Sequence, residues 1–131
     1  MHHQFAGVPS RTFSPGDVII QQGDRGAREA YLLHEGKVEV SRKVDGQKRI
    51  LRTLVKGDLL GEVALFRDAP HSATAVAIDR VTLLVIPADR LEQMVREHPA
   101  LAIALIRQLA RMAAADDAPP ADLADAEPYT E

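Results

Sequence analysis

The sequence contains no cysteine and no tryptophan, and its other aromatic residues are two tyrosines and three phenylalanines. Without thiols the chain forms no disulfide, thiolate zinc site, iron–sulfur centre or cysteine nucleophile, which fits a reducing compartment. No apolar run is long enough to cross a bilayer, and the first residues, MHHQFAGVPSRTF, lack the segments of a secretion signal. A chain of 131 residues can bury one core, so we expect a single domain. Because it has neither thiols, a secretion signal nor a membrane-spanning run, we also expect a soluble, cytoplasmic protein without a membrane partner.

Basic residues are missing from the C-terminal end of the chain. Residues 116–131 carry six acidic side chains and no basic one, so the net charge of −3 divides into −6 for this tail and +3 for residues 1–115. Elsewhere basic residues stand singly or in two small clusters, which are Arg42, Lys43 and Lys48, Arg49, Arg52. We interpret these as solvated strand edges, because a nucleic-acid face needs a basic stripe with stacking aromatics. An acidic tail also repels DNA, so no direct DNA binding by this chain is expected.

Residues 12–87 alternate between short β-rich runs and turn signals, a pattern typical of a sandwich or barrel. Five glycines next to acidic residues mark the turns: Gly16, Gly23, Gly36, Gly46 and Gly57. Asp45-Gly46 predicts the tightest hairpin, because both residue types tolerate positive φ angles. Strands are expected at residues 17–21, 30–34, 37–43, 49–55, 72–77 and 81–87.

After residue 87 the composition changes to helix formers, which predict helices at residues 88–97 and 99–115 on either side of the break at Pro99. Leu101, Leu105, Leu109 and Met112 are expected to form one apolar stripe of the second helix, with Ile103 and Ile106 elsewhere on it. Packing on the β body explains one apolar face only. The other face is expected to meet a partner subunit or to cover a ligand.

The stretch GEVALFRDAPHSATAVA, residues 61–77, is suited to hold a small anion. Gly61 lets the backbone approach a ligand closely, and the first N–H groups of a helical turn over residues 62–66 would form an anion site. Glu62 repels phosphate but can accept a hydrogen bond from a sugar hydroxyl, and Ser72 and Thr74 add hydroxyls. This combination indicates a nucleotide, although an ordinary helix N-terminus with a first-turn acid would show the same residues.

The order of several stretches is more specific than any one of them. FSPGDVIIQQGD, AYLLHEGKVEV, LVKGDLLGEVALF, PHSATAVA and LLVIP, followed by two helices, resemble the cyclic nucleotide-binding domain family of catabolite activators and protein kinase A regulatory subunits. The resemblance implies a mainly β fold, an eight-stranded jelly roll with flanking helices and two C-terminal helices. It also implies a regulatory domain at residues 12–115, between a flexible N-terminus at 1–11 and an acidic disordered tail or linker at 116–131.

The resemblance further implies that cyclic AMP or cyclic GMP is the ligand and that residues 61–74 form its phosphate-binding cassette. Glu62 would take the ribose 2′-hydroxyl, the amides of residues 63–65 would face the phosphate, and the last helix would close over the base. Ser72 and Ala73 would contact the phosphate from the other side. The expected contact residues are Gly61, Glu62, Val63, Ala64, Leu65, His71, Ser72 and Ala73.

Position 71 departs from the family pattern, in which nucleotide-binding members usually have arginine after the cassette proline. The arginine fork pairs with phosphate through two charge-assisted bonds, whereas His71 offers one donor and is largely neutral at pH 7. Losing such a contact costs about 2–3 kcal/mol, or roughly 30- to 150-fold in affinity. We expect weakened binding, and a binding affinity that rises from pH 8 to pH 6 if His71 contacts the phosphate as a cation. The alternative is a degenerate member that binds no nucleotide and forms a homodimer or another protein contact through its C-terminal helix.

The sequence lacks the motifs of the two classes of enzyme that its fold and residues suggest, a metal-binding jelly-roll enzyme and a serine hydrolase. The five histidines, at positions 2, 3, 34, 71 and 98, include no His-x-His pair within the β body, which a metal-binding jelly-roll enzyme needs. No Gly-x-Ser-x-Gly elbow is present either, and Ser72 directly follows His71 in a strand-like segment. We therefore expect neither a catalytic site nor a metal or other cofactor.

Overall fold

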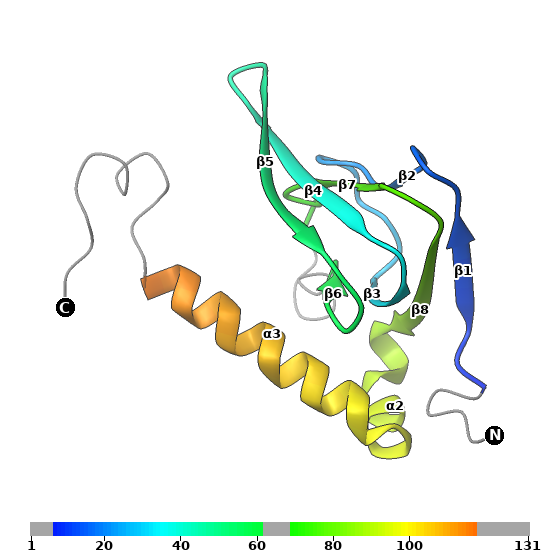
Figure 1. The fold of residues 1–131 in the computed structure, drawn as a ribbon. Coiled ribbons are helices and arrows are strands. Elements are labelled where there is room, and N and C mark those ends of the chain that lie inside the picture. The colour runs from blue at the N-terminus through cyan, green and yellow to red at the C-terminus, as the bar shows by residue number, and fades with distance from the viewer. Residues whose placement is uncertain (1–6, 62–68, 118–131) are drawn as a thin grey trace.

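The computed structural model describes residues 7–61 and 69–117, and within them two four-stranded antiparallel sheets face each other (Figure 1). The first sheet, with strand order β1-β8-β3-β6, is built from β1 (Ser10–Phe13), β8 (Val81–Pro87), β3 (Glu29–Glu35) and β6 (Leu59–Leu60). The second, with order β2-β7-β4-β5, is built from β2 (Val18–Ile20), β7 (Thr74–Ala77), β4 (Val38–Val44) and β5 (Gln47–Leu54). The expected mainly β jelly-roll fold is confirmed.

The predicted hairpin joins β4 and β5. Asp45 has a φ of 54° and Gly46 a φ of 78°, so both central residues of the turn take the positive angles that a tight reversal of twisted strands requires. The strand expected at residues 81–87 is found at those residues, and the other five predicted strands are found with ends shifted by one or two residues. Two strands, β1 and β6, were not expected, and β1 starts inside the segment that was expected to be a flexible N-terminus.

Apolar residues of the first sheet are buried on both of its faces. Leu33, Leu83 and Val81 point between the sheets and pack with Val38 and Leu54 of the second sheet. Leu32 and Ile86, by contrast, lie on the outer face and pack against the C-terminal helices. The chain therefore buries two apolar layers, one between the sheets and one under the helices, which explains why β8 reads as a continuous apolar run.

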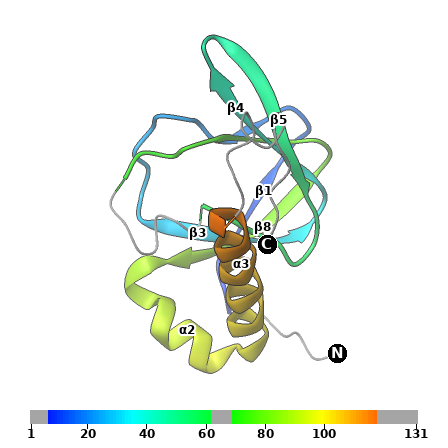
Figure 2. The ribbon, with the colours of Figure 1, turned by 90° about the vertical axis from the view of Figure 1, so that its left-hand side faces the viewer.

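The helical segment consists of a 3₁₀ turn η1 (Ala88–Arg90) and the helices α2 (Leu91–Glu97) and α3 (Pro99–Asp117). Figures 1 and 2 show both helices on the outer side of the first sheet, with α3 running past β6. None of the helices in the described ranges has the length and apolarity needed to cross a membrane.

The buried stripe of α3 differs from the predicted one. Leu101, Ala104 and Leu105 are buried as helical spacing requires, but the next position on this face is Gln108, which is 6% exposed. Leu109, expected on the stripe, is 44% exposed. The prediction was wrong at this turn because it followed the apolar residues of the sequence, whereas Gln108 is the α3 residue that lines the cavity beside the sheet.

Candidate functional site

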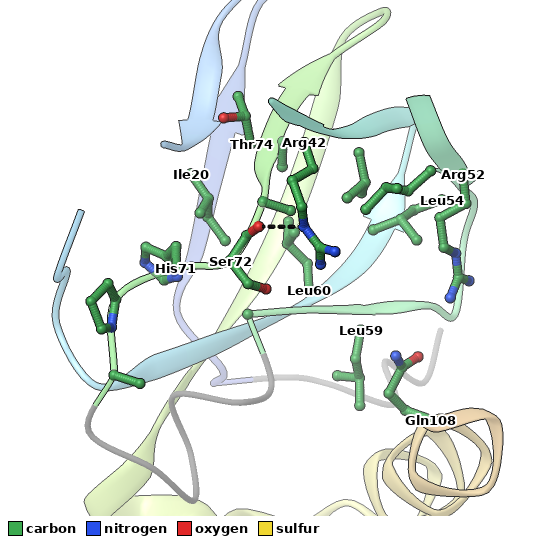
Figure 3. Close-up of a pocket in the computed structure, with 17 residues that line it drawn as sticks. Ile20, Arg42, Arg52, Leu54, Leu59, Leu60, His71, Ser72, Thr74 and Gln108 are labelled. Atoms are coloured by element: carbon green, nitrogen blue, oxygen red, sulfur yellow. Dashed lines mark hydrogen bonds between the residues drawn. The ribbon is translucent and has the colours of Figure 1, made fainter. Parts of the chain in front are cut away.

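A cavity of about 380 Å³ opens at the end of the sandwich, between the second sheet, β6 and α3 (Figure 3). Cavities of this size are typical of small-ligand sites. Aliphatic side chains form much of its wall, and the polar lining groups come from β4, β5, α3 and the segment before β7. The described lining residues include Ile20, Val40, Arg42, Arg52, Leu54, Leu59, Leu60, Gly61, His71, Ser72, Ala73, Thr74 and Gln108.

Gly61 stands where the chain leaves β6 and enters the cavity wall. Its φ is +74°, a backbone angle that residues other than glycine rarely adopt. A Cβ atom at this position would also lie 3.2 Å from Cδ1 of Ile20, which lines the same cavity. The turn therefore favours glycine at this position, and a larger residue would also have to displace the end of the Ile20 side chain. The predicted helical turn over residues 62–66 and the contact residues Glu62, Val63, Ala64 and Leu65 lie outside the described residues.

His71 is held against the loop between β2 and β3. Its backbone N–H donates to the carbonyl of Asp24 at 2.9 Å, and its carbonyl accepts from the N–H of Gly23 at 2.8 Å. Its ring packs on Gly26, because a Cβ atom there would lie 3.2 Å from Nε2. The imidazole is thus half-buried between this loop and the cavity, and a side chain at position 26 would require the ring to shift by a few tenths of an ångström.

The hydroxyl of Thr74 is hydrogen-bonded inside the protein. Its hydroxyl accepts a hydrogen bond from the backbone N–H of Gln22 at 3.0 Å and another from Nε2 of Gln21 at 3.4 Å. These bonds attach the β2–β3 loop to β7. Thr74 and Ser72, which precedes β7, both line the cavity, so the predicted ligand contact through the Thr74 hydroxyl stays a prediction.

Arg42 is the charged residue of the cavity that the sequence analysis missed. It lies on β4 two residues after Val40, so both side chains face the cavity. Its Nε donates to the carbonyl of Ser72 at 2.8 Å, and Figure 3 shows the guanidinium reaching into the cavity beside Ser72. The alternation of Val38, Val40 and Arg42 along the predicted strand was the signal that could have identified it.

Strand β5 contributes a second arginine because of an irregularity in its pairing with β4. Val40 pairs with Arg52 but Ser41 pairs with Ile50, so Leu51 is an extra residue on β5. Such a bulge turns neighbouring side chains toward the same side, and Leu51 and Arg52 both line the cavity.

The turn before β6 is tied to α3 through Asp58. One carboxylate oxygen lies 3.2 Å from Nη2 of Arg111 on α3, and the other lies 3.5 Å from Nη2 of Arg52. The same Arg111 nitrogen donates to Oε1 of Gln108 at 2.8 Å. The side chain of Gln108, which lines the cavity, is therefore oriented by charged groups on both α3 and the β body. The sequence analysis did not foresee this polar contact, since the partners are far apart in the chain.

A further polar cluster lies outside the cavity, on β1 and β3. The Tyr31 hydroxyl donates to Oε2 of Glu29 at 2.8 Å, and the same carboxylate oxygen forms an ion pair with Arg11 at 2.8 Å. Burial of Tyr31, together with its hydrogen bond to Glu29, raises the pKa of Tyr31 to about 12. The phenol therefore remains neutral near pH 7, and the cluster joins β1 to β3. Among the described residues, no group of three or more His, Cys, Asp or Glu side chains is placed to hold a metal ion.

Comparisons with known proteins find a matching family model and several similar chains. The family model described as a cyclic nucleotide-binding domain matches residues 10–98. The cyclic AMP receptor protein of Thermus thermophilus is 36% identical over 102 residues, which cover 77% of this chain and 47% of that protein. The acetyltransferase Pat of Mycolicibacterium smegmatis is 37% identical over 97 residues, covering 64% of this chain and 29% of Pat.

The crystal structure of the Thermus thermophilus catabolite activator protein superimposes with a TM-score of 0.73 at 33% identity, covering 87% of this chain and 54% of that one. The chain thus spans less than half the length of the two curated relatives and about half of the solved structure.

Proposed function

Because the chain belongs to the cyclic nucleotide-binding domain family, we propose that it is a regulatory domain that binds cyclic AMP or cyclic GMP in the cavity between the second sheet, β6 and α3. The observation that carries the proposal is the cavity itself. Its volume of about 380 Å³ lies in the range of small-ligand sites. It also has a glycine turn and Ser72 at one side, aliphatic walls, and a polar group of α3 at the other.

The chemistry of the lining supports an anionic ligand with an apolar part. Two arginines line the cavity, and no acidic side chain does so among the described residues. The aliphatic residues Leu54, Leu59 and Leu60 offer contact area for a base or sugar. In this proposal, as the family resemblance implies, Glu62 accepts the ribose hydroxyl and the amides of residues 63–65 face the phosphate.

Helix α3 is the element through which binding would be transmitted. Gln108 contacts the cavity, and Arg111 one turn later joins it to Asp58 of the β body. A ligand that contacts Gln108 changes the free energy of one position of α3 relative to others, which is what a regulatory domain needs. The proposal includes no reaction and no contact with DNA or a membrane.

A calorimetric titration of the purified chain with cyclic AMP and cyclic GMP, with adenosine as the phosphate-free comparison, tests this function. We expect saturable binding of at least one cyclic nucleotide and weaker binding of adenosine. Ser72→Asp places a negative charge where the phosphate is proposed to bind and should abolish binding. Ser10→Asp, on the exposed part of β1, should leave binding unchanged. Absence of binding by the natural sequence up to about 1 mM ligand would refute the proposal.

A second candidate function is favoured by the exposed side of α3. Ile103, Ile106 and Leu109 are 51%, 65% and 44% exposed, and together they form an apolar surface on one helix. The homodimer or protein-interaction role expected from the sequence would use this surface. Light scattering over a dilution series tests it: a dimer that Ile106→Glu dissociates supports the role, and a monomer at every concentration contradicts its dimer form.

A further inference from the structure

The cavity contains a positive charge that the family cassette does not provide. We propose that the guanidinium of Arg42 on β4 binds the phosphate of the cyclic nucleotide and takes the place of the arginine absent at position 71. This inference rests on the function proposed above, because it assigns a residue to that ligand. It differs from the sequence-based expectation, in which loss of the arginine at position 71 weakens binding and no residue of β4 contacts the ligand.

Among the described residues, Arg42 is hydrogen-bonded through Nε alone. Its Nε is used by the Ser72 carbonyl at 2.8 Å, and this bond holds the guanidinium beside the segment expected to contact the phosphate. The two terminal nitrogens have no hydrogen-bond or ion-pair partner among the described residues. An arginine held at Nε with both terminal nitrogens available matches the paired acceptor oxygens of a phosphate.

The other two basic side chains that line the cavity, Arg52 and His71, contact other parts of the protein. Arg52 forms an ion pair with Asp58, with 3.5 Å between Nη2 and Oδ2, so its charge is partly compensated. The His71 ring packs on Gly26 of the β2–β3 loop. Among the described lining residues this leaves Arg42 as the permanent charge without an ion-pair partner, and its terminal nitrogens are free to pair with a phosphate.

The backbone around Arg42 is also held in place, as a positioned binding group requires. The side chain of Gln22 accepts from the N–H of Lys43 at 2.8 Å and donates to the carbonyl of Lys43 at 3.2 Å. The backbone N–H of Gln22 in turn donates to the Thr74 hydroxyl at 3.0 Å. These bonds connect the end of β4 to the chain segment that carries Ser72. They therefore hold the backbone of Arg42 at a fixed position relative to Ser72.

The test uses Arg42→Gln and Lys43→Gln in the full chain. Both variants remove one positive charge from β4, but Lys43 lies on the opposite face of the strand. Calorimetric titration with the cyclic nucleotide that the natural sequence binds should show a loss of roughly 30- to 150-fold for Arg42→Gln and a change of less than about twofold for Lys43→Gln. Because Arg42 is exposed and its bond to Ser72 faces solvent, both variants should unfold at the same temperature.

Two further measurements separate phosphate binding from a general change in cavity shape. Adenosine has no phosphate, so its affinity should be equal for Arg42→Gln and the natural sequence. His71→Arg should restore at least tenfold of the affinity lost in Arg42→Gln and gain less when Arg42 is present, because one phosphate accepts a limited number of such bonds.

The outcomes are distinct. Unchanged cyclic nucleotide affinity in Arg42→Gln overturns the assignment of Arg42 while the proposed function stands, and so does an equal loss of adenosine affinity. Failure of the natural sequence to bind any cyclic nucleotide overturns both.

Discussion

Gly36 offers a quantitative test of how the β3–β4 connection is packed. Its φ is +92°, and a Cβ atom there would lie 2.3 Å from the carbonyl oxygen of Arg80, 2.8 Å from Oδ1 of Asp79 and 3.0 Å from Cα of Val81. Two of these atoms belong to backbone and cannot move without shifting the β7–β8 turn. Gly36→Ala should therefore cost about 1–2 kcal/mol for the left-handed angle and a further 1–3 kcal/mol for the overlap.

Gly57 is the matched control for this substitution. Its φ of +96° is nearly the same, but a Cβ atom there would have no neighbour within 4 Å. Gly57→Ala should lose only about 1–2 kcal/mol, and the restriction of the unfolded chain, which offsets part of each loss, is the same for both variants. The difference between the two therefore measures the overlap alone. Urea unfolding with equal m-values provides both free energies, and losses that agree within about 0.5 kcal/mol would refute the reasoning.

Two polar clusters, at Tyr31 and at Asp58, hold elements of the fold together through contacts that can be removed by substitution. Because the folded state raises the pKa of Tyr31 to about 12 from 10.0, it holds the phenolic proton more tightly than the unfolded chain, so stability should fall as pH rises from 10 to 12. Tyr31→Phe, which removes the bond to Glu29, should flatten that part of a urea-unfolding pH series, and an equally steep loss would contradict this assignment. Asp58→Asn should lower the free energy of unfolding by about 1 kcal/mol, because its two ion pairs are partly exposed, and should loosen α3 in hydrogen exchange; protection equal to that of the natural chain would show that other contacts hold the helix.

The elements that the sequence predicted well are those specified by neighbouring residues. Asp45-Gly46 supplies the two positive φ angles of its turn locally, and the apolar run 81–87 is long enough to be recognised without its partners. The two strands that were missed are short and depend on partners distant in the chain. β1 is defined by pairing with β8, and the two residues of β6 by pairing with β3. No local pattern distinguishes such segments from a loop.

The candidate site likewise has a part that the sequence predicted and a part that it did not. Gly61, His71, Ser72 and Ala73 were found as one motif because they follow each other closely in the chain, and all four line the cavity. Arg42 was dismissed as part of a basic cluster, although its spacing from Val40 put it on the inner face. The sequence therefore predicted the contiguous part of the site and missed the part contributed by a neighbouring strand.

By itself, the sequence determined the mainly β fold, the tight turns and the segment around Gly61 and His71 that lines the cavity, because each depends on conformational preferences within a few residues. Only the tertiary structure decided which charges face the cavity. Arg42 meets Ser72 because β4 lies beside β7, and Gln108 meets the cavity because Arg111 and Asp58 join α3 to the turn before β6. These contacts depend on pairing and packing between segments that are 30 or more residues apart, and no local preference encodes them.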